Sequence, residues 1–134
     1  MLIEELMVGD YVYNNINQVC KVYAITGLGI PYVQVDNFST DNGCFEIGLC
    51  TEYNGIPLTK EILEKNGFVK VENTQTSTII YSFRDSLFRI GVFDFNHVTI
   101  DSYYTDSSCD VFISSVHELQ HALRLCGINK EIKL

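Results

Sequence analysis

The chain has 134 residues, 46% of them hydrophobic and 19% charged, a composition that is typical of a globular protein and excludes an intrinsically disordered one. No apolar run approaches the roughly 20 residues of a membrane-spanning helix, and the N-terminus carries acids where a secretion signal needs bases. The net charge of −8 comes without clusters of lysine and arginine, which excludes direct binding to a nucleic acid backbone.

The first half of the sequence is predicted to form short strands. Segments 10–15 (DYVYNN) and 18–25 (QVCKVYAI) flank an Asn-rich turn at residues 14–17, which predicts a β-hairpin. Segments 32–38 (YVQVDNF) and 44–50 (CFEIGLC) predict two further strands. Several short strands at this spacing indicate a small antiparallel sheet or barrel.

A short helix is predicted in the middle of the chain, within residues 55–68 (GIPLTKEILEKNGF). Thr59 is a favourable N-cap, because its hydroxyl can accept a hydrogen bond from a backbone amide of the first turn. Asn66 and Gly67 can close the C-terminal end. A helix of about two turns indicates a structural role.

A second block of strands is predicted after this helix, at residues 77–83 (STIIYSF), 87–95 (LFRIGVFDF) and 97–104 (HVTIDSYY). The polar residues 71–77 (VENTQTS) before this block are predicted to form an exposed loop. We expect Gly91 to mark a β-bulge, because the large apolar residues before and after it have opposite parity along the strand.

The last predicted element is an amphipathic helix within residues 114–127 (SSVHELQHALRLCG). The order of elements predicts an α+β fold: small antiparallel β-sheets or a barrel in the N-terminal half, a short middle helix, further antiparallel strands and a C-terminal amphipathic helix. We expect a single domain over residues 1–134, which can be subdivided into a β-rich half, 1–55, and a helix–strands–helix half, 56–134.

The sequence HELQH in this last helix matches the H-E-x-x-H signature of zinc hydrolases. In such enzymes two histidines one helical turn apart bind zinc, and the glutamate activates the water on the metal. A zinc-dependent hydrolase is therefore one hypothesis, with His117 and His121 as zinc ligands and Glu118 as the catalytic base.

The distribution of apolar residues around the helix argues against this hypothesis. At about 100° per residue, one side of the helix is an apolar stripe that would dock on the rest of the protein. His117 and His121 project from the opposite side, so we expect both to point at solvent or at a partner. The stripe consists of Val116, Leu119, Ala122, Leu123 and Cys126.

The neighbouring residues also favour a structural helix. One zinc-hydrolase extension requires glycine at position 124 and histidine at position 127, where this chain has Arg124 and Gly127. Ser115 and Glu118 have the spacing of a capping box, and Gly127 fits the C-terminal end of a helix. We therefore interpret the match as coincidental and assign no catalytic, cofactor-binding or metal-binding residue.

The cysteines are odd in number and include no C-x-x-C pair, which argues against a zinc ribbon and against a disulfide framework. We expect reduced core thiols in a cytoplasmic protein. They are Cys20, Cys44, Cys50, Cys109 and Cys126.

Three segments, 1–13 (MLIEELMVGDYVY), 55–68 and 116–123 (VHELQHAL), together resemble a family of small uncharacterised proteins of Bacteroides and their phages. In that family a similar opening, an Ile-Pro-Leu-Thr helix and a Val-His-x-Leu-Gln helix recur in this order, although the intervening strands match poorly. The position of His121 is usually asparagine there, and that of Glu118 is commonly glutamine. The resemblance implies a family not built around zinc and a phage or mobile-element setting, and it carries no function with it.

Acidic side chains are concentrated in residues 1–53, which hold seven acids and a single base, Lys21. This excess favours a basic protein partner, or else it only keeps the protein soluble. We predict a non-enzymatic cytoplasmic binding protein without a cofactor, acting through a protein interface on the N-terminal sheet, with a homo-oligomer as a second arrangement. A phage counter-defence protein that sequesters a nucleotide signal is the alternative of the same class.

Overall fold

The computed structural model describes most of the chain, and its internal contacts divide into two compact units. Unit 1 consists of Met1–Pro57 and Ser115–Ile128, and unit 2 of Leu58–Ser114 and Asn129–Leu134. The C-terminal helix thus belongs to the same unit as the N-terminal sheet, whereas the predicted subdivision counted it with residues 56–134. The residues described are 5–27, 31–38, 44–72, 79–83, 88–94, 97–102, 113–125 and 127–134.

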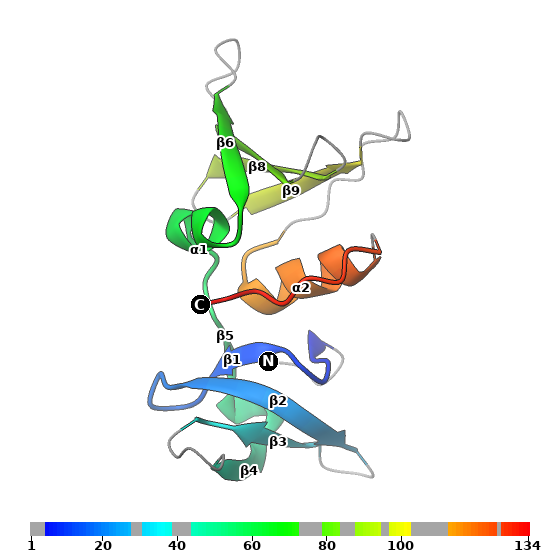
Figure 1. Cartoon of the computed structure of the whole chain (residues 1–134). Coiled ribbons are helices and arrows are strands. Elements are labelled where there is room, and N and C mark those ends of the chain that lie inside the picture. The colour runs from blue at the N-terminus through cyan, green and yellow to red at the C-terminus, as the bar shows by residue number, and fades with distance from the viewer. Residues whose placement is uncertain are drawn as a thin grey trace. The chain divides into compact units, whose positions relative to one another are not determined.

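Unit 1 contains a five-stranded sheet in the order β4-β3-β2-β1-β5 (Figure 1). Every pair of neighbouring strands is antiparallel, which confirms the antiparallel sheet predicted for the N-terminal half. Among the described strands, β4 and β5 form the two edges of the sheet. Its strands are β1 (Tyr11–Tyr13), β2 (Val19–Thr26), β3 (Tyr32–Asp36), β4 (Phe45–Leu49) and β5 (Asn54–Gly55).

The turn between β1 and β2 is built on asparagine chemistry, as the sequence predicts. Oδ1 of Asn14 accepts hydrogen bonds from the backbone amides of Ile16 at 3.2 Å and Gln18 at 2.9 Å. Asn17 has a φ of 58°, a left-handed conformation that asparagine tolerates better than most residues. The side chains thus replace backbone partners that the turn lacks.

One face of the sheet, called the inner face below, carries the core of unit 1. Val33 and Val35 on β3 are fully buried and lie opposite Ile25 and Val22 on β2. A 3-10 helix, η2 (Cys50–Glu52), follows β4 directly and contributes a cysteine to the same core. The buried cluster consists of Leu6, Val12, Cys20, Val22, Val33, Val35, Cys50 and Tyr53, with Ile25 packed against it.

Unit 2 contains a second antiparallel sheet, in the order β6-β7-β8-β9. The three strands predicted after the middle helix are confirmed, but the first strand of this sheet, at residues 68–72, was not predicted, and its last two residues fall in the predicted loop at 71–77. Residues 73–77 lie outside the described part. The elements are α1 (Lys60–Lys65), β6 (Phe68–Glu72), β7 (Ile79–Phe83), β8 (Phe88–Asp94) and β9 (His97–Ser102).

The bulge predicted at Gly91 lies two residues further on. Gly91 keeps regular register with Ile80 on β7 and Thr99 on β9. The register of β8 against β9 shifts between Val92 and Asp94, so the extra residue is the phenylalanine between them. The change of parity seen in the sequence is real, but it begins at that phenylalanine rather than at the glycine.

Helix α1 begins and ends where its sequence predicts. Oγ1 of Thr59 accepts a hydrogen bond from the amide of Ile62 at 3.3 Å, and Gly67 follows the helix with a φ of 84°. The C-cap residue Asn66 also exchanges two hydrogen bonds with the backbone of Lys133, at 2.7 and 2.8 Å. One asparagine therefore both closes the helix and fixes the C-terminal segment of unit 2.

Helix α2 (Val116–Leu125) has both predicted caps. The amide of Ser115 donates to Oε2 of Glu118 at 3.0 Å, the glutamate half of a capping box. At the other end, Gly127 has a φ of 73° and its amide donates to the Arg124 carbonyl, while the Ile128 amide donates to the Leu123 carbonyl. This pair of bonds is a Schellman motif.

Neither helix of the described chain has the length and apolar character that a bilayer crossing requires.

Candidate functional site

The polar side of α2 packs against the segment before β1, within unit 1. The prediction that both histidines face solvent or a partner is therefore wrong. His117 is only 5% exposed, and the side chain of His121 is 20% exposed. The residues of the predicted apolar stripe that the structure describes are also buried. The helix is therefore buried on two sides, which an amphipathic pattern alone does not reveal.

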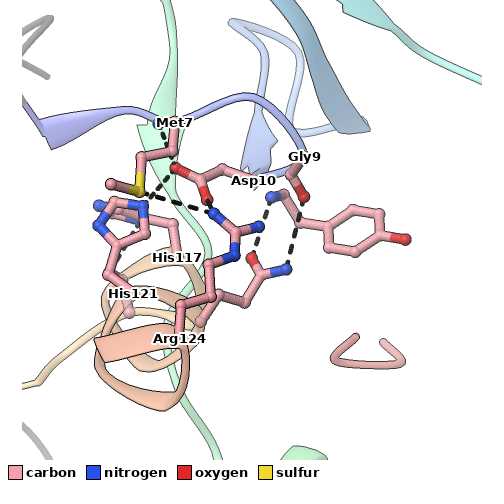
Figure 2. A network of polar contacts seen from close by, with 9 residues as sticks. Met7, Gly9, Asp10, His117, His121 and Arg124 are labelled. Atoms are coloured by element: carbon pink, nitrogen blue, oxygen red, sulfur yellow. Dashed lines mark hydrogen bonds and ion pairs between the residues drawn. The ribbon is translucent and has the colours of Figure 1, made fainter. Parts of the chain in front are cut away.

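The group that receives His121 is the carboxylate of Asp10, in the segment before β1 (Figure 2). Asp10 is fully buried, and its Oδ2 lies 2.7 Å from Nε2 of His121 and accepts the Met7 amide at 2.6 Å. Its Oδ1 accepts no hydrogen bond within the described residues, and Nη1 of Arg124 lies 3.5 Å away. A buried carboxylate needs such partners, because taking its charge out of water is costly.

Gln120 fixes the position of α2 along the same segment. Its Oε1 accepts the Tyr11 amide at 3.3 Å, and its Nε2 donates to the Gly9 carbonyl at 3.5 Å. A Cβ atom at Gly9, where φ is 93°, would lie 3.2 Å from Nη2 of Arg124. The glycine therefore permits both the backbone turn and the close approach of the arginine.

His117 has a different environment from His121. Its Nδ1 lies 2.9 Å from Oγ of Ser115, and a Cβ atom at Gly55 would lie 3.0 Å from its Cε1. Burial lowers the pKa of His117, and the nearby His121 lowers it further, although the carboxylates of Asp10 and Glu118 act in the opposite direction. His117 therefore favours the neutral form inside the fold.

The HELQH side chains do not form the arrangement that catalytic zinc requires. The carboxylate of Glu118 accepts the Ser115 amide, so it acts as a cap rather than facing a metal-bound water. Nε2 of His121 is engaged by Asp10. Within the described residues, no three His, Cys, Asp or Glu side chains gather in a way that could hold a metal ion. The motif is used here to attach a helix.

The two buried thiols of unit 1 that the structure describes, Cys20 and Cys50, are not activated nucleophiles. Cys20 and Cys50 are buried and Cys44 is half-buried, and all three are free. Burial, followed by the charge of Glu46, raises the pKa of Cys20 to about 11, so the unreactive thiol form prevails at neutral pH. Cys109 and Cys126 lie outside the described residues.

The face of the sheet opposite the core, called the outer face below, exposes a row of apolar side chains. Phe45, Ile47 and Leu49 on β4 are 49%, 69% and 37% exposed. Tyr32 on β3 lies opposite Leu49, and the ring of Tyr23 on β2 is centred 5.0 Å from that of Phe45. Such a row on a strand at the edge of a sheet is unusual, because it invites association.

The inner side of β4 is polar. Glu46 and Gly48 lie opposite the buried Val35 and Val33, and the Glu46 carboxylate accepts the side-chain amides of Asn14 at 3.3 Å and Asn37 at 3.2 Å. A cleft of about 190 Å³ lies there, lined by Asn14, Asn15, Glu46, Ile47, Gly48, Glu52 and Tyr53.

Comparisons of the chain with protein-family models, with curated proteins and with solved structures gave no match.

Sequence reasoning missed Asp10 and the outer face. Asp10 was counted only as part of the acidic excess, and nothing local marks it as a partner of a residue 111 positions away. The β4 pattern was visible, since Phe45, Ile47 and Leu49 alternate with Glu46 and a glycine. The alternation predicts two unlike faces, but it does not say that the polar one turns inward.

We predict that His121→Ala lowers the free energy of unfolding by about 2 kcal/mol, because the buried Asp10 carboxylate then loses its closest side-chain partner. Urea unfolding of the single variants His121→Ala and Asp10→Asn and of the double variant measures the coupling. Strictly additive losses would show that the two side chains do not interact in solution.

The lowered pKa of His117 predicts a loss of stability at mildly acidic pH. The unfolded chain binds a proton at this histidine below about pH 6.5, whereas the folded chain resists protonation until its lower pKa is reached. The stability that this histidine contributes is thus complete above the pKa of the unfolded chain, about pH 6.5. It falls as the pH drops from there toward the lower pKa of the folded chain. We expect a His117→Gln variant, compared by urea unfolding between pH 5 and 8, to lose less stability on acidification. A pH-independent difference between the two proteins would contradict this.

Metal analysis separates the structural interpretation of HELQH from the hydrolase hypothesis. We expect protein purified without a histidine tag to contain no stoichiometric zinc, because the side chains that zinc needs are engaged within the chain. Stoichiometric zinc that is lost in His121→Ala would overturn the structural interpretation.

Proposed function

We propose that the protein is a non-enzymatic binding protein that acts through a protein interface on the outer face of the unit 1 sheet. The observation that supports this is the exposed row of Phe45, Ile47 and Leu49 on β4. Covering these side chains with a partner would contribute on the order of 1 kcal/mol each. Aromatic residues, which are enriched at protein interfaces, flank the row at Tyr23 and Tyr32.

Charge favours a basic partner over a neutral one. Residues 1–53, which supply most of this sheet, contain seven acids and a single base. Complementary charge speeds the encounter of two proteins and disfavours partners of the same sign. The resemblance of three segments to proteins of Bacteroides and their phages supports the bacterial cytoplasm, and a phage or mobile-element origin, as the setting.

The matched pair Ile47→Ser and Val69→Ser tests this proposal. The two side chains are similarly exposed, at 69% and 65%, and both lie on strands, but Val69 belongs to β6 in unit 2. In pull-downs from bacterial lysate, we expect the wild type and Val69→Ser to retain the same proteins and Ile47→Ser to lose them. Circular dichroism checks that both variants are folded.

Two outcomes would contradict the proposal. Retention of the same proteins by Ile47→Ser would show that the outer face is not the interface. A retained nucleotide, seen by native mass spectrometry of the purified protein without any protein partner, would favour the sequestering alternative.

A further inference from the structure

Resting on the proposed function, we infer that β4 binds its partner by strand addition: an extended segment pairs antiparallel with the free edge of β4 and alternates apolar residues with lysine or arginine. The partner is thus recognised by backbone geometry and by a two-residue chemical pattern.

The hydrogen bonds at both ends of β4 establish which of its backbone groups face the free edge. The Asn37 amide donates to the Cys44 carbonyl at 3.0 Å, and the Cys50 amide to the Pro31 carbonyl at 3.3 Å. In an antiparallel ladder the residues that bond to one neighbour alternate along the strand. Residues 44, 46, 48 and 50 therefore face β3, and the backbone groups of Phe45, Ile47 and Leu49 face outward.

The outward groups are available over a short stretch. Phe45 and Ile47 have no hydrogen-bond partner for these groups within the described residues. The Leu49 amide is already capped by Oε2 of Glu52 at 2.7 Å. An added strand can therefore pair fully with two residues of β4 and reach the Leu49 carbonyl, so the segment recognised is short.

Of the devices that usually protect an edge strand, β4 has one, the inward-pointing carboxylate of Glu46. Natural edges carry a lysine, a proline or a bulge, whereas β4 reads Phe-Glu-Ile-Gly-Leu in regular register with β3. The register shift of this sheet lies between Val22 and Ala24 on β2, away from the edge. Without a lysine, a proline or a bulge, the edge at β4 remains able to pair with another strand.

The two faces of β4 determine the pattern of the added segment. Its residues opposite Ile47 share the outer face and are expected to be apolar, like the row they extend. Its alternate residues lie on the side of Glu46 and Glu52, where a basic side chain meets two carboxylates. A Cβ atom at Gly48 would lie 2.6 Å from Oε2 of Glu52 and 2.9 Å from the Tyr53 hydroxyl, so these groups crowd this side of the strand.

Charge favours such a segment over a second copy of the chain. Antiparallel self-pairing centred on Ile47 would put the two Glu46 carboxylates on the same face, in diagonal positions about 7–8 Å apart. Two chains of net charge −8 would also be brought together. A basic strand avoids both the approach of two Glu46 carboxylates and the repulsion between two negatively charged chains.

The test uses fluorescence anisotropy with a nine-residue peptide of alternating valine and lysine as the probe. In the antiparallel register, valine amides bond to β4 and lysine amides point away. We expect N-methylation of the valines to weaken binding at least about tenfold and N-methylation of the lysines to leave it unchanged. A peptide with glutamate in place of lysine should bind at least about tenfold more weakly.

Variants of the protein complete the design. Ile47→Pro removes the outward amide and should abolish binding of the peptide, whereas Ile47→Val and Val69→Ser should leave it unchanged. The fold tolerates a proline at an edge position of this kind.

If both N-methylated peptides bind equally but Ile47→Ser loses the peptide, strand addition is wrong and the outer-face interface stands. If the probe does not bind at low salt while Ile47-dependent capture of host proteins persists, the basic strand pattern is wrong. If substitution of Ile47 changes neither the binding of the peptide nor the capture of host proteins, both proposals fail.

Discussion

The buried carboxylate of Asp10 constrains the arrangement of unit 1. Removing this charge from water costs several kcal/mol, and the Met7 amide alone does not offset that cost. The remaining partners, His121 and Arg124, lie on one side of α2. The helix must therefore turn its polar side toward residues 7–11. Once it does, Gln120 meets the backbone beside β1 and His117 falls next to Gly55.

This constraint explains why the caps of α2 could be predicted and its orientation could not. Ser115, Glu118 and Gly127 act within one or two turns of their own helix, so their spacing carries the information. The contact of His121 with Asp10 joins residues 111 positions apart. The rule that polar faces meet solvent fails here because a buried polar group is acceptable once it is paired. The same local logic predicted the β1–β2 turn and both ends of α1.

Strand β4 could likewise be predicted as a strand, but not which of its two sides faces the core. Its alternation predicted a strand correctly, and the usual expectation would bury the apolar side. Instead Glu46 faces the core side, where two asparagine amides satisfy its carboxylate, and Gly48 leaves room for η2 and Tyr53. The larger side chains, with Phe45 and Ile47 the most exposed, are therefore on the outer face. On β3 the ordinary pattern holds, since Val33 and Val35 are buried.

Because unit 1 combines Met1–Pro57 with Ser115–Ile128, its two parts are synthesised before and after most of unit 2. The N-terminal sheet emerges from the ribosome before α2, and the side chains that contact Asp10 emerge only after unit 2 has almost all been made. The nascent sheet therefore holds an uncompensated acid until α2 arrives. A chain truncated before residue 115 would lack His121 and Arg124 altogether, so its sheet would be less stable than that of the intact unit.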